Sequence, residues 1–161
     1  MNSKICKLAA QLKIANDTDE EVNSLMSQYV AITKALYLLH QQNHWDAISH
    51  GNHLLFERLY EEVLEISDET AERVIGLCGD VKFGGFEEIA LKFMPQEKTN
   101  DSLLKSSLAL EEAYQQFSKK LYNTLKEKDF ITLGLDDLIM GNASEGENRI
   151  YLLKQALKNN S

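Results

Sequence analysis

The stretch of sequence that decides the fold is residues 53–79, HLLFERLYEEVLEISDETAERVIGLCG, which contains no proline and ends on a glycine. Its apolar residues recur at the three- and four-residue spacing of one helix face: Leu55, Leu59, Val63, Ile66, Val74 and Leu77. Gly79 follows the last of them, where helices commonly end. The pattern predicts one long amphipathic helix from about residue 53 to residue 78.

A polar stripe follows a neighbouring face of this helix. At 100° per residue, His53, Glu57, Asp68 and Glu72 fall within about 100° of one another around the axis. Imidazole and carboxylate are ligands that iron and similar divalent metals favour. At a rise of roughly 1.5 Å per residue, however, about 16 Å separates the first pair from the second. One helix alone cannot close a metal site with these residues.

A two-fold axis across the helix would remove this difficulty, because such an axis brings together positions whose numbers have a constant sum. His53 with Glu72 and Glu57 with Asp68 satisfy this condition, since 53 and 72 have the same sum as 57 and 68. The spacing therefore predicts a homo-oligomer built from symmetric dimers, with two equivalent metal sites in each dimer.

Helical periodicity extends over the rest of the chain. Further long helices are expected over about 19–45, from about 101, and over about 135–158, and FEEIALKFM (86–94) has the pattern of a short amphipathic helix. A tight reversal is expected over 46–52, which contains Gly51, and the only proline, Pro95, lies in the connection 80–100. Residues 1–161 are therefore expected to form a single all-α domain, a four-helix bundle with a short extra helix.

Composition narrows the function classes. The formal net charge of −8 and the pI near 5.0 oppose binding to nucleic acid phosphates and favour cationic cargo. The two cysteines, Cys6 and Cys78, lie far apart without CxxC spacing, which disfavours a disulfide framework or a zinc knuckle and fits a reducing cytoplasm. No stretch has the roughly 20 apolar residues of a membrane span or the pattern of a signal peptide. A cytoplasmic protein without a membrane segment is expected.

All four histidines fall within one short stretch around the only tryptophan, Trp45. His40 lies on the apolar stripe of the 19–45 helix and is predicted to be a hydrogen-bonded core histidine. His50 lies in the expected reversal and is most simply an exposed residue. His53 also lies on the polar stripe described above and is a candidate ligand.

The chain resembles the Dps family of mini-ferritins. The likeness rests on HW (44–45), on the histidine and acid that open the next helix, on SDETAERVIGLCG (67–79) and on DLIMGNASEGENRIYLLKQAL (137–157). It implies a ferritin-like four-helix bundle that assembles into a hollow dodecamer. It also implies a ferroxidase, which oxidises Fe(II) with H2O2 or O2, protects the cell from oxidative stress and stores ferric mineral.

The resemblance also implies roles for particular residues. His44, His53 and Glu57 of one subunit, with Asp68 and Glu72 of the other, would hold a dinuclear iron site, and Trp45 would lie beside the iron as an electron donor. A second acidic set, Asp137 and Glu147, matches positions along a three-fold iron-entry pore, although a solvated helix face explains these two acids equally well. Asn142 could line such a pore without adding charge.

The sequence departs from the family pattern at several points. His44 and His53 are only nine positions apart, a shorter spacing than usual, which leaves His50 as an alternative ligand to His44. Glu57 stands where aspartate is commoner, and the N-terminal segment lacks a lysine-rich character, so DNA binding is not expected. A non-enzymatic shell, DNA-protecting or structural, with a zinc-binding or degenerate site, is the alternative. A di-iron site within each bundle is disfavoured because Glu-x-x-His pairs are lacking.

Overall fold

The computed structural model describes residues 20–79 and 82–159, and over these residues its regular secondary structure is all α-helix. The helices are α2 (Glu20–Asp46), α3 (His50–Cys78), α4 (Phe86–Phe93), α5 (Asn100–Glu127) and α6 (Leu133–Asn159). The predicted all-α bundle with a short extra helix is confirmed. Cys6 and the N-terminal segment considered above lie outside the described residues.

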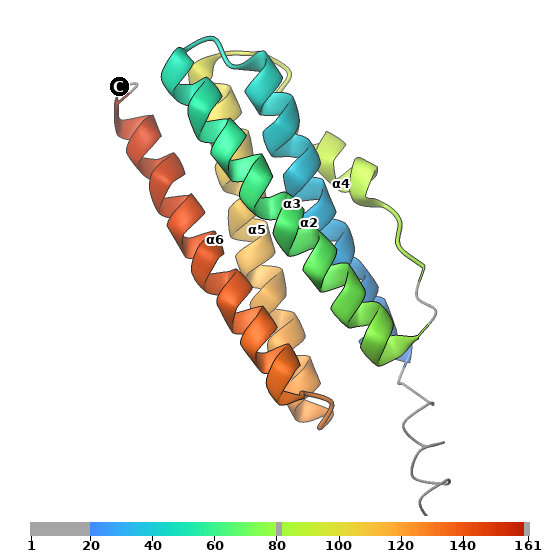
Figure 1. Cartoon of the computed structure of the whole chain (residues 1–161). Helices are drawn as coiled ribbons and strands as arrows, with labels where there is room; N and C mark the ends of the chain where they lie inside the picture. The colour runs from blue at the N-terminus through green and yellow to red at the C-terminus, as the bar shows by residue number, and fades with distance from the viewer. Residues whose placement is uncertain (1–19, 80–81, 160–161) are drawn as a thin grey trace, which may run out of the picture.

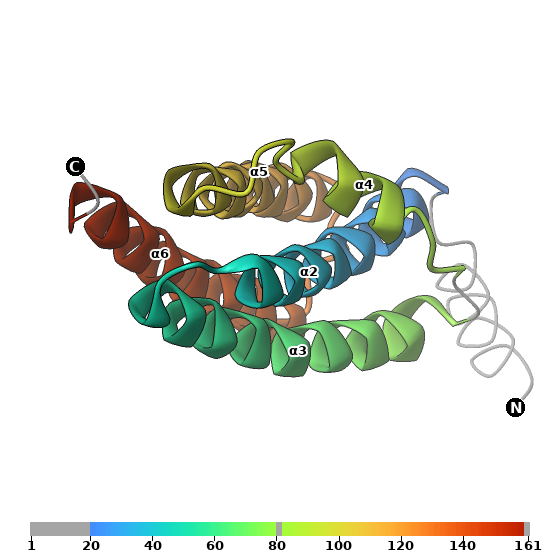
Figure 2. The same ribbon diagram turned by 90° about the horizontal axis from the view of Figure 1, so that it is seen from above.

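The four long helices lie side by side, with α4 outside α2 and α5 (Figures 1 and 2). Helices α2 and α3 form an antiparallel hairpin, and α5 and α6 form a second one. Because α3 and α5 run in the same direction, the connection between them must travel the length of the bundle, and it carries α4 along the way. Short hairpin turns and one long crossover are typical of ferritin-like bundles.

The turn between α2 and α3 is shorter than predicted. Only residues 47–49 lie outside the two helices, and Gly51 is helical, so the expected reversal over 46–52 is wrong in extent. The cause is a helix cap, because the Ser49 side chain accepts a hydrogen bond from the backbone N–H of Asn52 at 3.3 Å. At the other end of α3, Gly79 has a φ of 75° and ends the helix as predicted.

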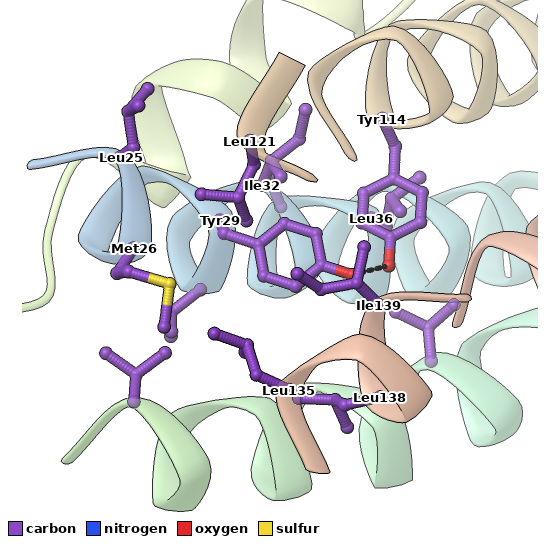
Figure 3. Packing of buried hydrophobic residues seen from close by; sticks show 14 of the residues in the cluster. Leu25, Met26, Tyr29, Ile32, Leu36, Tyr114, Leu121, Leu135, Leu138 and Ile139 are labelled. Atoms are coloured by element: carbon purple, nitrogen blue, oxygen red, sulfur yellow. Dashed lines mark hydrogen bonds between the residues drawn. The ribbon is translucent and has the colours of Figure 1, made fainter. Parts of the chain in front are cut away.

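Helix α2 lies at the centre of the core. It contacts α3, α4 and α5, and its buried residues are spread around its circumference, as expected for an enclosed helix. Side chains from α5 and α6 meet those of α2 in one apolar cluster (Figure 3). Within it the Tyr29 and Tyr114 rings stack at 5.6 Å, and their hydroxyls share a 2.8 Å hydrogen bond.

Among the helices of the described residues, none is both long and apolar enough to cross a membrane.

Candidate metal centre

The candidate ligands His44 and His53 meet at the end of the bundle where α2 turns into α3. His44 is near the C-terminal end of α2, and His53 is in the first turn of α3. The same end is fastened to the crossover connection by an ion pair of 2.7 Å between Lys98 Nζ and Asp46 Oδ1. Burial alone would raise the pKa of Asp46, but hydrogen bonds from Lys98 and Gln42 outweigh it and lower that pKa.

Each imidazole is hydrogen-bonded to the backbone of the other histidine. Nδ1 of His44 is 3.0 Å from the backbone oxygen of His53, and Nδ1 of His53 is 3.1 Å from the backbone oxygen of His44. The rings stack with centroids 3.9 Å apart and planes 30° from parallel. The three-residue turn makes this pairing possible because it brings the two helix ends directly together.

These hydrogen bonds decide which nitrogen of each ring can bind a metal. A carbonyl oxygen can only accept, so each Nδ1 must carry the proton. In a neutral imidazole the other nitrogen, Nε2, then presents a free lone pair. Metal-binding histidines are generally oriented by a bond from the non-ligating nitrogen to a carboxylate, a backbone carbonyl or water. Both His44 and His53 are therefore oriented to bind a metal through the lone pair of Nε2.

The residues near this pair differ in exposure and in their contacts. Glu57 is half-buried one helical turn after His53. Tyr60, on the next turn, packs edge-on against the His44 ring with centroids 5.3 Å apart. Burial raises the pKa of Tyr60, and the nearby carboxylates of Glu61 and Glu57 raise it further. Trp45 is 65% exposed.

Asp68 and Glu72 do not reach the histidines within one chain. Helix α3 is continuous from His50 to Cys78, so the four polar residues do share one stripe, but both acids are exposed toward its far end. Asp68 borders a hollow of about 230 Å³ formed with residues of α2 and α4. Across residues 20–79 and 82–159 of a single chain, no three histidine, cysteine or acidic side chains lie close enough to hold one ion.

The remaining histidines have different environments. His50 is exposed in the first turn of α3. His40 is fully buried, with Nδ1 3.0 Å from the Ser107 hydroxyl and Nε2 2.8 Å from Glu111 Oε1, so the predicted hydrogen-bonded core histidine is confirmed. Both of its nitrogens are engaged, which leaves none for a metal.

A buried ion pair beyond His40 was not predicted. Glu111 on α5 accepts two hydrogen bonds from the Arg149 guanidinium on α6, at 2.7 Å from Nε and 3.2 Å from Nη2. Burial alone would raise the pKa of Glu111, but the hydrogen bond from His40 and the charge of Arg149 lower it below its ordinary value of 4.5. Both charged residues lie on the apolar stripes of their helices, and this position in the sequence could have indicated that they are buried.

The predicted pore residues fall on α6. Asp137 and Glu147 are exposed. Asn142 is instead buried, with its amide 3.2 Å from the Thr70 hydroxyl and 3.5 Å from that of Tyr29. Within one chain this amide belongs to the polar part of the core, and a place for Asn142 at a pore stays a prediction.

Comparison with solved structures finds the same fold in Dps proteins. Dps from Thermosynechococcus elongatus superposes with a TM-score of 0.73 at 22% identity, over 89% of this chain and 94% of that chain. A mutant of Mycobacterium smegmatis Dps1 gives 0.72 at 19% identity, over 87% and 99%. A tetragonal form of Mycobacterium smegmatis Dps gives 0.65 at 20%, over 83% and 85%.

No family model matches the sequence, and no curated protein sequence matches it. The evidence of likeness is thus structural. The chain has the Dps fold, including the short helix α4 between α3 and α5, and the predicted resemblance is confirmed at the level of the fold.

Proposed function

We propose that this chain is a member of the Dps family, a cytoplasmic mini-ferritin that oxidises Fe(II) with H2O2 and stores the ferric product inside a dodecamer. The dinuclear site would lie between two subunits related by a two-fold axis. The observation that carries the proposal is the reciprocal hydrogen bonding of His44 and His53, which leaves Nε2 of both rings free to bind metal, with the half-buried Glu57 one helical turn after His53 on α3.

The donor set suits iron as a substrate. Two imidazoles can hold Fe(II), and hard carboxylate oxygens favour the Fe(III) that oxidation produces. Two Fe(II) ions together supply both electrons that H2O2 needs for reduction to water. This stoichiometry avoids the release of hydroxyl radical, so peroxide removal and iron storage would occur together. Zn²⁺ could occupy the same nitrogens and carboxylates but cannot change oxidation state there.

The second subunit would provide Asp68 and Glu72. Both are exposed in the single chain and lie on the same stripe of α3 as His53 and Glu57, in a register that an antiparallel two-fold crossing would match. The crossing would also bring Glu57 of one chain near Asp68 of the other. These like charges would repel each other until a cation bound between them, so iron binding and pairing of the subunits would favour each other.

The exposed acids Asp137 and Glu147 on α6 are proposed to attract Fe(II) toward an entry pore. The same overall acidity makes DNA a poor partner. Retarded plasmid in a low-salt gel-shift assay, without added divalent metal, would instead favour the DNA-protecting alternative.

The proposal is tested by following peroxide-dependent Fe(II) oxidation by the full chain through the absorbance of the ferric product. His53→Ala and Asp68→Ala should each lose the protein-dependent rate, because each removes a donor from every site. Glu69→Ala is the matched control, since Glu69 is an exposed acid beside Asp68 but lies off the stripe. Equal rates in all four proteins would remove the proposed centre.

A mixture of the two inactive variants tests whether each site spans two chains. When His53→Ala pairs with Asp68→Ala, one site carries both changes and the other carries neither. With random pairing of equal amounts, about one quarter of the sites should be intact, and activity should return to about that level. A mixture that stays inactive after dissociation and reassembly would contradict a site shared between subunits.

A further inference from the structure

The His44 ring is enclosed by two other rings. His53 stacks on it with centroids 3.9 Å apart, and Tyr60 packs edge-on with centroids 5.3 Å apart. Tyr60 in turn contacts Tyr37 of α2 with centroids 6.2 Å apart and planes 81° from parallel. An unbroken line of aromatic contacts thus leads from the candidate metal ligands into the space between α2 and α3.

The tryptophan expected to serve the metal centre is placed differently. Trp45 is 65% exposed, and within the described residues it makes no ring contact with His44 or His53. Over residues 20–79 and 82–159, Tyr60 is the oxidisable side chain whose ring packs against a candidate ligand. Proximity to the reacting atoms decides which side chain meets a short-lived oxidant first.

We propose that Tyr60, rather than Trp45, is the electron donor that intercepts one-electron oxidants at this site; the inference rests on the function proposed above. The relevant event begins when a single bound Fe(II) reduces H2O2 by one electron, which yields Fe(III), hydroxide and hydroxyl radical. The phenol hydrogen atom of Tyr60 passes to hydroxyl radical, giving water and a tyrosyl radical. A second Fe(II) returns one electron to that radical, and a solvent proton restores the phenol.

This sequence balances without a further reductant. Two Fe(II) become two Fe(III), and one H2O2 with one proton becomes water and hydroxide. The side chain is regenerated in each cycle. Tyr60 thereby provides a safe route when the two irons of a site do not react together.

The charges around the two tyrosines favour oxidation of Tyr60 over Tyr37. Lys34 Nζ lies over the Tyr37 ring, 4.9 Å from its centroid, and a nearby cation makes removal of an electron less favourable. Tyr60 instead has Glu57 one turn before it and Glu61 beside it on α3. Negative charge close to the Tyr60 ring makes loss of an electron from that ring more favourable.

The test is electron paramagnetic resonance of the full chain, freeze-quenched after mixing with Fe(II) and H2O2. The unmodified protein should give a tyrosyl signal. Tyr60→Phe keeps the ring but should lose that signal, while hydroxyl radical captured by a spin trap should rise. Trp45→Phe should keep the tyrosyl signal, as should Tyr151→Phe, a control at an exposed position on α6.

The remaining outcomes each overturn the inference. A tyrosyl signal that survives Tyr60→Phe and disappears with Tyr37→Phe would assign the donor role to Tyr37, and a tryptophanyl signal lost in Trp45→Phe would return it to Trp45. Iron oxidation without any protein radical or change in spin trapping would leave the proposed function standing and remove Tyr60 as donor. Absence of protein-dependent iron oxidation would remove both.

Discussion

His40 and His44 lie one turn apart on α2, yet their surroundings differ in the property that decides metal binding. His40 uses both ring nitrogens, toward Ser107 and Glu111, inside a network that extends to the Arg149 guanidinium. His44 uses only Nδ1, and its partner is a backbone carbonyl. In the first arrangement, the closed network, both nitrogens of His40 are hydrogen-bonded to protein groups. In the second, Nε2 of His44 stays free to bind a metal.

This difference separates a histidine that stabilises the bundle from one that is proposed to bind metal. Burial alone does not distinguish them, because His44 is only 9% exposed. The identity of the hydrogen-bond partners does, since a carboxylate with a guanidinium behind it completes the charge balance whereas a carbonyl only orients the ring.

The largest expected effect comes from breaking the closed network. Glu111→Leu leaves the Arg149 charge buried without its carboxylate, and should lower the free energy of unfolding by about 3–5 kcal/mol. The double variant with Arg149→Met should lose less, because both charges leave together. Chemical denaturation measures both, with Glu112→Ala as an exposed control on the same helix. A single variant as stable as the double would contradict the assigned pairing.

The same carboxylate should shape the acid limb of the stability curve. Its pKa is below the ordinary 4.5, so it favours the folded state above pH 4.5 and this contribution is lost as the pH falls through its folded-state pKa. Glu111→Gln cannot ionise and should flatten the pH dependence below 4.5. Denaturation curves at a series of acidic pH values compare it with Glu112→Gln, which should keep the slope.

Matched substitutions of the two histidines should separate stability from activity. His40→Gln breaks a buried network and should lower unfolding free energy by about 1–3 kcal/mol, with iron oxidation retained. His44→Gln should lower it by about 1 kcal/mol or less, because one hydrogen bond to a backbone oxygen is lost, yet iron oxidation should disappear. Denaturation and ferric absorbance on the same preparations provide the readouts; the reverse pattern would exchange the roles assigned to the two residues.

The smallest effect is expected at Gly146, beside the closed network. A Cβ there would clash with Gln115 Nε2, so Gly146→Ala must displace the Gln115 amide from its 2.7 Å hydrogen bond to the Ala143 oxygen. That loss is of order 1 kcal/mol, and alanine in a helix returns a similar amount. The unfolding midpoint should therefore hardly move. A large loss would mean that Gln115 cannot rotate away.

Much of the fold could be predicted from local patterns. The apolar stripe of 53–79 and Gly79 give α3 and its end, and FEEIALKFM gives α4 within one residue. The turn before α3 was predicted too long because Gly51 suggested a break, whereas the Ser49 cap starts the helix at His50, three residues earlier than predicted. Capping depends on side-chain geometry that periodicity does not contain.

The site was predictable in part, for a similar reason. The spacing of His53, Glu57, Asp68 and Glu72 indicates a shared stripe, and a continuous α3 provides it. The stacking of His44 on His53 and the contact with Tyr60 depend on how two helices meet across a three-residue turn, which is tertiary information. Glu111 and Arg149 were missed because acids and arginines are usually exposed, and only their mutual pairing makes burial possible.

The short turn at residues 47–49 has a consequence for the order of events during biogenesis. Contacts between neighbours in sequence form early, whereas contacts between separate chains wait for a bimolecular encounter. The pair of imidazoles can therefore form together with the α2–α3 hairpin while the chain is still a monomer. Under the proposed scheme Asp68 and Glu72 of the second subunit join the site at a rate that depends on subunit concentration. A newly made chain would therefore be inactive until it dimerises.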